Sequence, residues 1–600
     1  MRKVDMGQSA VPEPLADALR ACRRHLLFAA GFSALVNILY LAPTLYMMQV
    51  YDRVLATGGE LTLVFITVVI VFALATLAAL DHIRSRILVR AGLRLDRLLA
   101  GQVLERLMQR VRSGPGAARV VQAMREFDSF RGTLTGPAVL ALFDAPWTPI
   151  YLLFTFILHP LLGALTLVGA IALVVLAVAN ERSTKGKLQK AAEAQAASYV
   201  SQEAAAQSGE VVRALGMRRA LVSRQLADRR VATTLQAEAQ FSGGKYSGAI
   251  KFLRLVLQSL ALGVGAWLAV ERQISAGAVI AASVLLSRAL QPIEQLVGAW
   301  SGIVQARGSF RTLVELFAQI PAEQQRTQLP PPKGLIQVEG VTMRAPGSDA
   351  FVLRSVSLSV LPGETVGVIG PSGAGKTTLA RIVSGALTPD YGTVRVDGAD
   401  MKDWESERLA RHVGYLPQDS VLFAGTIRDN ISRFSATIGG DPGEIDAKVI
   451  AAAEAAGAHD LILRLPQGYD TPLGLGGRGL SAGQGQRVAL ARALYGDPSM
   501  VVLDEPNSHL DAEGEAALVK SLRQLKDRGA SVIIVAHRTG ILNVVDKLVV
   551  LRDGQVDLFG PRDEVVAKLT QRDGTLPKNS KATPPGPSSQ IAGSAAAGTA

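Results

Sequence analysis

The residues best suited to chemistry form a glycine-rich loop that ends in a lysine and two threonines. This loop reads Gly370-Pro371-Ser372-Gly373-Ala374-Gly375-Lys376-Thr377-Thr378. A short apolar run typical of a strand precedes it and a helical pattern follows it, which is the context that a phosphate-binding loop requires. Backbone N–H groups of such a loop converge on phosphate oxygens at a helix N-terminus. A chance glycine-rich turn is the alternative, and both flanking patterns disfavour it.

The side chains of this loop, with an acidic pair further along, predict a site for ATP and Mg²⁺. Lys376 would reach the β- and γ-phosphates, and the Thr377 hydroxyl would bind Mg²⁺. The buried-strand pattern at Met500–Leu503 ends in Asp504 and Glu505. Two ionised carboxylates at a strand tip are costly unless they face cations or polarise water. We therefore expect Asp504 to orient Mg²⁺ and Glu505 to activate the attacking water.

The composition indicates a membrane half joined to a soluble half, because 48% of the residues are hydrophobic while 19% are charged. A bilayer needs about 20 apolar residues per helix. The stretches that meet this length are Leu26–Val50, Leu61–Leu80, Pro137–Leu158, Leu161–Ala179, Ala249–Val270 and Ala276–Leu296. The first is too long for the apolar core of a signal peptide and lacks a small-residue cleavage site.

Basic residues predict that both chain ends lie on one side of the membrane. Arginines and lysines gather before the first span and in the long connections 81–136 and 180–248, whereas the other connections are short and charge-balanced. The positive-inside rule then puts both termini, the long connections and the nucleotide-binding half in the cytoplasm. Much of the net charge of +12 belongs to these connections, so no nucleic-acid partner is predicted.

Four charged residues fall inside the predicted spans: Asp144, Arg254, Arg288 and Glu294. Charge within a bilayer is costly and usually faces a partner or an aqueous pathway. Arg254 and Glu294 lie near the cytosolic face by depth, where they are expected to snorkel. Asp144 and Arg288 lie deeper, and a polar transport path is favoured for them over a structural ion pair.

Further motifs of the second half, in their order along the chain, resemble the nucleotide-binding domain of ABC transporters. They are Tyr415-Leu416-Pro417-Gln418 (the Q-loop), Leu480-Ser481-Ala482-Gly483-Gln484 (the signature, usually LSGGQ), Ser508-His509-Leu510-Asp511 (the D-loop) and His537 (the switch histidine). Ala482 departs from the usual second glycine of the signature. Ala345 stands where the family carries the aromatic residue that stacks on adenine, and Phe351 is a weak substitute.

This resemblance implies that two copies of the chain complete each ATP site. Ser481 and Gly483 would contact the γ-phosphate held by the opposite protomer of a homodimer, and Gln418 would sense Mg²⁺. The implied catalytic residues are Glu505, His537, Lys376 and Gln418, and the implied metal-binding residues are Thr377, Gln418 and Asp504. Residues 370–378 are assigned to nucleotide binding, together with Ser481, Gly483, Gln484 and Asp511.

The fold implied by the resemblance is an α-helical six-span membrane domain of the ABC exporter type, followed by an α/β P-loop ATPase domain with a helical subdomain. The expected divisions are a cytosolic segment 1–25, a membrane domain 26–321, a linker 322–333, a nucleotide-binding domain 334–570 and a disordered tail 571–600. The linker contains three consecutive prolines, which stiffen it, and the tail is rich in Pro, Ser, Ala and Gly. One membrane half and one ATPase half make a half-transporter.

Four local stretches resemble the protease- and lipase-exporting branch of type I secretion ATPases. They are residues 46–55, 143–151, 287–294 and 504–511. This resemblance implies an inner-membrane permease that exports unfolded polypeptide with a C-terminal signal, with a periplasmic adaptor protein, an outer-membrane channel and membrane lipid as partners. The alternative is an exporter or flippase of lipids or amphipathic small molecules. The six spans exclude a soluble P-loop ATPase.

Overall fold

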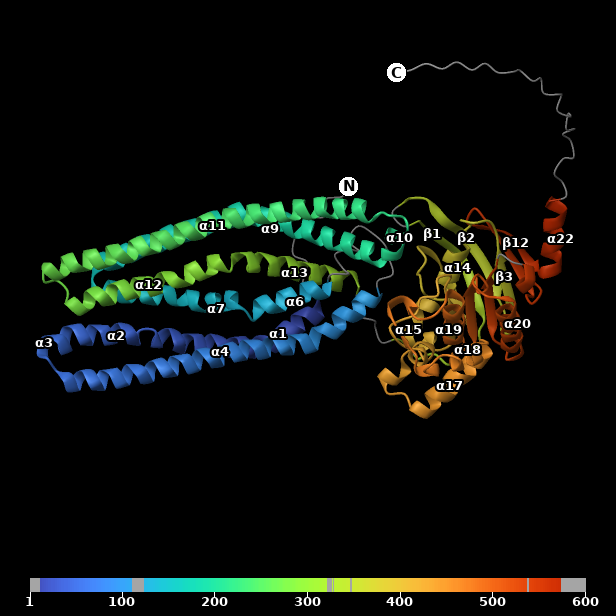
Figure 1. Cartoon of the computed structure of the whole chain (residues 1–600), viewed down its shortest axis with the longest axis horizontal. Helices are drawn as coiled ribbons and strands as arrows, with labels where there is room; N and C mark the ends of the chain where they lie inside the picture. Colours follow the sequence, from blue (N-terminus) through green and yellow to red (C-terminus); the bar gives the residue numbers. More distant parts are fainter. Residues whose placement is uncertain are drawn as a thin grey trace, which may run out of the picture. The chain divides into compact units, whose positions relative to one another are not determined.

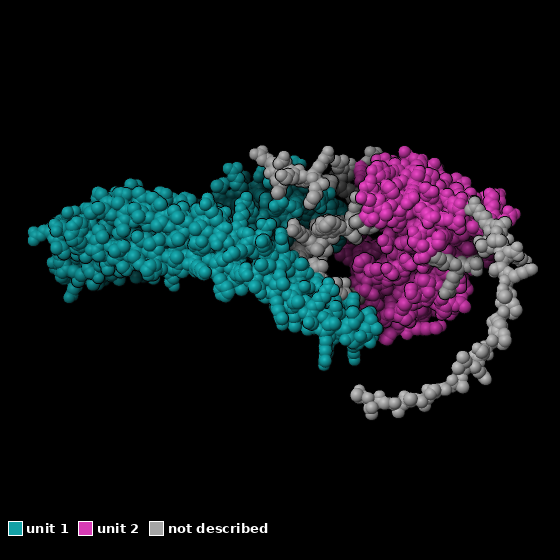
Figure 2. All heavy atoms as spheres, turned by 90° about the horizontal axis from the view of Figure 1, so that it is seen from above, with its two compact units in different colours: residues 1–323 teal, residues 324–600 magenta. Residues whose placement is uncertain are grey.

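The computed structural model describes residues 11–109, 123–320, 326, 328–345, 348–536 and 539–573. Contacts within the chain divide it into two compact units, residues 1–323 and 324–600, which Figure 2 colours separately. The predicted switch residue His537 lies outside the described residues.

The first unit consists of helices, most of them long (Figure 1). Their bounds are α1 Glu13–Leu39, α2 Ala42–Gln49, α3 Leu55–Thr57, α4 Glu60–Gln109, α6 Ala123–Leu134, α7 Pro137–Asp144, α8 Thr148–Leu158, α9 Pro160–Gln207, α10 Gly209–Ala214, α11 Arg218–Val270, α12 Ala276–Gly298 and α13 Trp300–Gln319. A π-helical turn, η1 Val50–Val54, and a 3-10 turn, η2 Ala145–Trp147, interrupt them. In this described part, six helical stretches are long and apolar enough to cross a membrane, which confirms the predicted spans.

Three of the membrane-crossing helices are far longer than a bilayer requires. The helices α4, α9 and α11 have 50, 48 and 53 residues, whereas about 20 residues span the hydrocarbon core. Their apolar ends expose large side chains, as at Val69 and Phe72, which suits contact with lipid. Their polar ends extend into the long connections 81–136 and 180–248 as helix. Gly216, which has φ 65°, forms the turn between α10 and α11.

Three membrane helices are interrupted or carry a proline within their length. The first span breaks at Tyr40 and Leu41, between α1 and α2. The third breaks at η2, where Pro146 lies between α7 and α8. The sixth span, α12, contains Pro292. Proline removes a backbone donor and clashes with the preceding turn, so such positions bend or break a helix.

The second unit is built on a six-stranded sheet in the order β12-β11-β3-β10-β9-β6. Its strands are β3 Thr365–Ile369, β6 Val413–Leu416, β9 Met500–Asp504, β10 Ser531–Val535, β11 Lys547–Arg552 and β12 Gln555–Pro561. All of them run parallel except β12. The strands β9 and β10 are buried along their whole length, which explains their continuous apolar sequence.

A smaller antiparallel sheet and a set of helices complete this unit. The small sheet has the order β2-β1-β4-β5, with strands at Phe351–Val360, Ile336–Arg344, Tyr391–Val396 and Ala399–Asp400. A two-stranded sheet joins β7 Gly425–Thr426 to β8 Pro472–Leu473. The helices are α14 Lys376–Val383, α15 Ser406–Ala410, α16 Ile427–Ile431, α17 Pro442–Ala455, α18 His459–Leu463, α19 Ala482–Leu494, α20 Ala512–Asp527, α21 Thr539–Leu542 and α22 Arg562–Asp573. The predicted fold class is confirmed.

Candidate active site

The carboxyl ends of four parallel strands meet at one edge of the large sheet. Val535 of β10 pairs with Val368 of β3 on one side and with Asp504 of β9 on the other. Leu416 of β6 pairs with Leu503. The phosphate loop, the segment after Asp504 and the Q-loop therefore leave the sheet at the same edge, which is where open α/β sheets bind ligands.

The phosphate loop between β3 and α14 depends on glycine at two positions. Gly370 has φ 153°, and a Cβ there would lie 2.1 Å from the carbonyl oxygen of Leu551. Gly375 has φ 96°, and a Cβ there would lie 2.8 Å from the carbonyl oxygen of Val352. Larger residues would push the loop away from the strands behind it. Of the predicted residues, 370–375 thus form the turn and 376–378 are the first three residues of α14.

Lys376, the first residue of α14, is held inside this loop. Its ammonium group donates hydrogen bonds to the carbonyl oxygens of Gly370 and Pro371, both at 2.9 Å. Burial lowers the pKa of Lys376, and the carboxylates of Glu505 and Asp504 oppose that shift. The loop therefore fixes the ammonium at the site where phosphate oxygens are expected.

Asp504, the last residue of β9, is fully buried, and neither carboxylate oxygen has a hydrogen-bond partner among the described residues. Burial raises the pKa of its carboxyl group, and the nearby Thr377 hydroxyl opposes the rise without forming a hydrogen bond of full geometry. An unpaired buried carboxylate is costly. Two free carboxylate oxygens beside a hydroxyl are the hard oxygen ligands that Mg²⁺ prefers, so these residues fit the predicted metal.

Glu505 follows directly and has the left-handed backbone conformation, with φ 50°. Such strain in a non-glycine residue persists only where the surroundings impose it, and it is concentrated at active sites. The backbone N–H of Glu505 donates to the Val535 carbonyl at 3.0 Å, which ties the residue to the end of β10. The backbone of Glu505 is thus fixed directly after Asp504, and its role as the general base stays a prediction.

The signature segment forms the exposed N-terminus of α19. The Ser481 hydroxyl accepts from the Gln484 backbone N–H at 3.3 Å, and the Gln484 side chain accepts from the Ser481 N–H at 2.9 Å. Ala482 is exposed at the first helical position, so this departure from glycine fits the fold. Gly483 has no such freedom, because a Cβ there would lie 2.8 Å from the His509 carbonyl oxygen.

Gln486 is a residue that the sequence did not single out. Its side chain is 2% exposed and donates to the Glu505 carbonyl and the Ser508 hydroxyl, both at 3.2 Å. It also accepts from the His509 backbone N–H at 3.0 Å. Together with the close approach of Gly483 to His509, these bonds join the signature helix to the segment that carries Glu505.

The remaining predicted site residues differ in their contacts and exposure. Asp511 caps α20 through the Gly514 N–H at 2.8 Å and pairs with Arg487 at 2.5 Å, and these contacts lower its pKa. Gln418 is exposed in the loop after β6. Phe351 is 39% exposed, and the Arg344 guanidinium lies 5.5 Å from its ring centre. Its stacking on adenine stays a prediction, as do the nucleotide contacts of Asp511 and Gln418.

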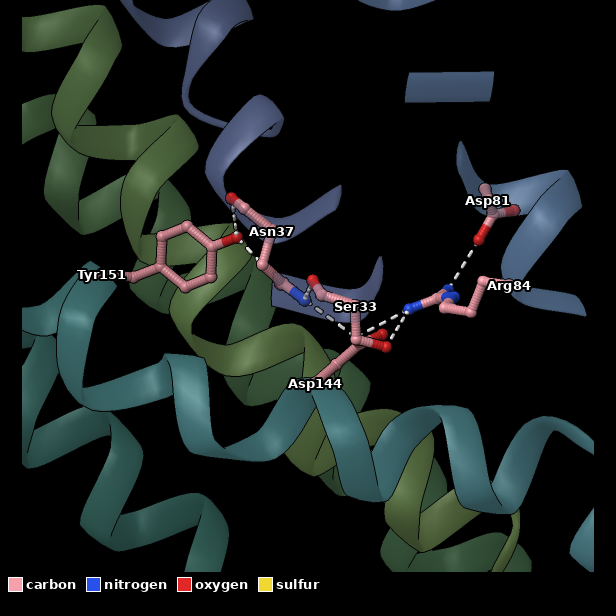
Figure 3. A network of polar contacts seen from close by, with 6 residues as sticks. All are labelled: Ser33, Asn37, Asp81, Arg84, Asp144 and Tyr151. Carbon is pink, nitrogen blue, oxygen red and sulfur yellow. Dashed lines mark hydrogen bonds and ion pairs between the residues drawn. The ribbon is translucent and has the colours of Figure 1, made fainter. Parts of the chain in front are cut away.

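Three of the four charged residues in the predicted spans form ion pairs, which their depth in the spans did not predict. Asp144 forms an ion pair with Arg84 at 2.9 Å and accepts from Asn37 at 2.8 Å (Figure 3). Asp144 therefore forms the structural ion pair that the sequence disfavoured, while its role in a transport path stays a prediction. Arg254 and Glu294 pair with each other at 2.7 Å, and their snorkelling at the cytosolic face also stays a prediction.

One motif of the membrane domain has a structural explanation. Asp52, in the stretch 46–55, accepts from the Ser275 hydroxyl at 2.6 Å and from the Gly277 backbone N–H at 2.7 Å. A Cβ at Gly277 would lie 2.6 Å from the Asp52 carboxylate. Asp52 thus binds the N-terminus of α12, where a carboxylate is favoured by the helix dipole, and joins the end of the first span to the start of the sixth.

Comparisons with known proteins agree with this arrangement. Residues 353–508 match the family described as ABC transporter, and residues 26–293 match the ABC transporter transmembrane region. The chain is 41% identical over 565 residues to the type I secretion system ATP-binding protein PrsD of Rhizobium meliloti (strain 1021), covering 94% of this chain and 95% of that protein.

Two further proteins extend the comparison. The cyclolysin secretion/processing ATP-binding protein CyaB of Bordetella pertussis (strain Tohama I) is 32% identical over 562 residues, covering 91% of this chain and 76% of that protein. A solved structure of a bacterial Atm1-family ABC exporter with ATP bound matches with a TM-score of 0.77 at 24% identity, covering 93% of this chain and 100% of that chain. This likeness shows the exporter fold.

Proposed function

Because this chain belongs to the ABC transporters and, among them, to the type I secretion ATP-binding proteins, we propose that it uses ATP hydrolysis to export unfolded polypeptides with a C-terminal signal. The observation that carries the proposal is the 41% identity to a type I secretion ATP-binding protein over 94% of this chain. The chain is a multi-pass membrane protein. We assign it to the inner membrane, with the ATPase domain and both termini in the cytoplasm.

The side chains of the candidate site have distinct proposed roles in hydrolysis. Lys376 neutralises the phosphates, and Asp504 with Thr377 holds Mg²⁺, which supplies charge stabilisation to the transferred phosphoryl group. Glu505 accepts the proton of the attacking water. Gln418 and His537 are proposed to complete the catalytic set after β6 and β10. Catalysis of this kind rests on positioning and electrostatics, which the buried strand ends provide.

We also propose that two copies of the chain form each ATP site. The N-terminus of α19 carries a partial positive charge, and its Ser481 is exposed, so it can meet a phosphate held by another protomer. Mixing Lys376→Ala subunits with Ser481→Arg subunits tests this arrangement. In a composite dimer both defects fall in one site and the other stays intact, so the mixture binds ATP better than either homodimer. Equal ATP binding by the mixture and the homodimers would contradict the shared site.

The cargo is tested with the purified transporter in lipid nanodiscs. A polypeptide with the correct C-terminal segment should change the ATPase rate, whereas the same polypeptide without that segment should not. In cells, export should stop when the periplasmic adaptor protein or the outer-membrane channel is deleted. A transporter that responds to lipids or amphipathic drugs, ignores polypeptides and works without these partners would instead be a flippase.

A further inference from the structure

A cavity of about 770 Å³ lies in the membrane domain where three spans break or contain proline. Its lining includes Tyr40 at the break of the first span, Asp144 beside the break of the third, and Pro292 within the sixth. Interrupted helices leave backbone carbonyl groups without intrahelical partners, and membrane proteins tolerate them where they face protein or a cavity. The cavity is thus lined by helix interruptions together with polar and charged side chains.

One wall of this cavity is a polar network that joins four helices (Figure 3), in which the buried Nε of Arg84 has no hydrogen-bond partner among the described residues. Arg84 of α4 pairs with Asp81 at 2.6 Å and with Asp144 of α7 at 2.9 Å. Asn37 of α1 donates to Asp144 and accepts from the hydroxyl of Tyr151 on α8. The Arg84 side chain is only 6% exposed and is shared by two carboxylates, so this network carries one negative charge in excess. Arg84 is therefore not available to bind an anionic ligand in the cavity.

Arg288 of α12 differs from Arg84 in having no acidic partner. Its guanidinium carbon lies 4.0 Å from the ring centre of Tyr40, and it donates to the Gln291 side chain at 3.1 Å. Within the described ranges, no carboxylate lies within ion-pair distance of it. A guanidinium has five N–H donors in a fork that matches a carboxylate. Arg288 thus keeps its N–H donors available to a ligand without a direct acidic partner, although Asp81 and Asp144 in the same lining balance the charges of Arg84 and Arg288 overall.

We propose that Arg288 recognises carboxylate groups in acidic segments of the exported polypeptide. The inference rests on the proposed function and names the chemistry that the cavity selects. The Tyr40 ring stabilises the cation without neutralising it. The side-chain amides of Gln291 and Gln295, which also line the cavity, can hydrogen bond to the main chain of any sequence. Acidic segments therefore bind better than neutral ones, while the amides keep the site tolerant of other side chains.

The test compares two unstructured peptides of equal length, one containing glutamates and the other glutamines at the same positions. Binding to the purified full-length transporter is measured by fluorescence anisotropy in nanodiscs of zwitterionic lipid. The acidic peptide should bind about tenfold more tightly, the scale of one charge-assisted hydrogen-bonded pair. Arg288→Gln should remove this preference. Arg288→Lys should keep part of it, because lysine keeps the charge but not the fork.

Arg182→Gln is the matched control, since Arg182 is an exposed arginine of α9 outside this cavity, and it should bind both peptides as wild type does. Monodisperse elution and an unchanged unfolding temperature identify folded variants. If folded Arg288→Gln retains the preference, or wild type binds both peptides equally, the inference falls while the proposed function stands. If wild type binds neither peptide, the inference also falls, while the proposed function is decided by its own test with the C-terminal segment. Arg288-dependent binding of anionic lipid, with no peptide bound, would assign the cation to a lipid headgroup and also overturn the inference.

Discussion

Two carboxylates, one in each unit of the chain, have opposite surroundings. Asp504 in the ATPase domain is fully buried, and both of its carboxylate oxygens lack a hydrogen-bond partner among the described residues. Asp144 in the membrane domain is enclosed by Arg84 and Asn37, which both donate to it. A buried charge is tolerated when it is paired, and otherwise it raises the free energy of the folded state. The unpaired carboxylate therefore indicates a cation-binding site, and the paired one indicates a junction between helices.

The largest effect is expected beside the unpaired carboxylate. Glu505→Gln keeps the shape of the side chain but removes the group that accepts a proton from water, so turnover should fall about a hundredfold or more. ATP binding should persist, because Lys376, Thr377 and Asp504 are untouched. ATPase assays and nucleotide binding on the purified transporter check both parts. Glu444→Gln, on the exposed surface of α17, is the control and should hydrolyse ATP normally. Near-normal turnover by Glu505→Gln would move the general base elsewhere, with His537 as the first candidate.

The second effect tests the paired carboxylate. Arg84→Met removes the cation between Asp81 and Asp144 and leaves Asp144 buried without its charge partner, so the free energy of unfolding should fall by about 3–5 kcal/mol. The double variant Arg84→Met with Asp144→Leu removes both charges and should lose less than Arg84→Met alone. Unfolding of the detergent-solubilised transporter, monitored against temperature, measures this order. A double variant that is less stable than Arg84→Met would show that the loss of the Arg84–Asp144 ion pair does not explain the lower stability of Arg84→Met.

The sequence predicted which residues of the candidate ATP site gather at the sheet edge because the parts of this site are local. Residues 370–378 and the acids at 504 and 505 follow strand patterns directly, so their spacing along the chain also fixes their position at the sheet edge. The membrane pairing was missed for the opposite reason. Arg84 and Asp144 are 60 residues apart, and Arg84 was counted as a basic residue of a cytosolic connection. Periodicity predicts the spans but gives no information on which buried faces meet.

Gln486 is intermediate between the local motifs of the ATP site and the distant pair of Arg84 and Asp144. It is only two residues after the signature, yet its partners Glu505, Ser508 and His509 are 19 to 23 residues away. A single glutamine in a helix gives no sequence signal of such contacts. Gly483 shows the same limit, because the sequence assigned it to phosphate contact, whereas the structure adds a close approach to the His509 carbonyl. Hydrogen bonds between side chains of different loops depend on the tertiary structure that places the loops together, so local sequence does not predict them.

The third prediction concerns this connection. Gln486→Ala removes three hydrogen bonds that hold the segment of Glu505, so kcat should fall about tenfold while KM changes little. Gln486→Glu should recover little, because a carboxylate cannot donate to the Glu505 carbonyl or share the same pattern of bonds. Gln524→Ala, on the exposed face of α20, serves as the matched control. An unchanged kcat in Gln486→Ala would show that Glu505 is positioned without this side chain.

The smallest expected effect is a pH dependence that arises from Asp504 itself. Burial raises the pKa of its carboxyl group above the ordinary value of 3.8, so the folded protein holds this proton at pH values where the unfolded chain has lost it. The contribution of Asp504 to stability in the absence of nucleotide therefore decreases as the pH rises from that ordinary value through the raised one. Mg²⁺ binds the ionised carboxylate, so its binding has the opposite dependence and strengthens as the pH rises through the same window.

The competition between a proton and Mg²⁺ for Asp504 can be measured as the gain in ATP affinity that Mg²⁺ gives, between about pH 5 and about pH 8 at constant ionic strength. This gain should change by a few fold over that range. Asp504→Asn should flatten that dependence, because an amide does not titrate, and should remove most of the Mg²⁺-dependent gain in affinity. Asp144→Asn should leave the dependence in place, since Asp144 belongs to the other unit and already has its cation in Arg84. If the pH dependence of the Mg²⁺-dependent ATP affinity persists in Asp504→Asn, another group titrates. That result would contradict the assignment of Asp504 as the metal ligand.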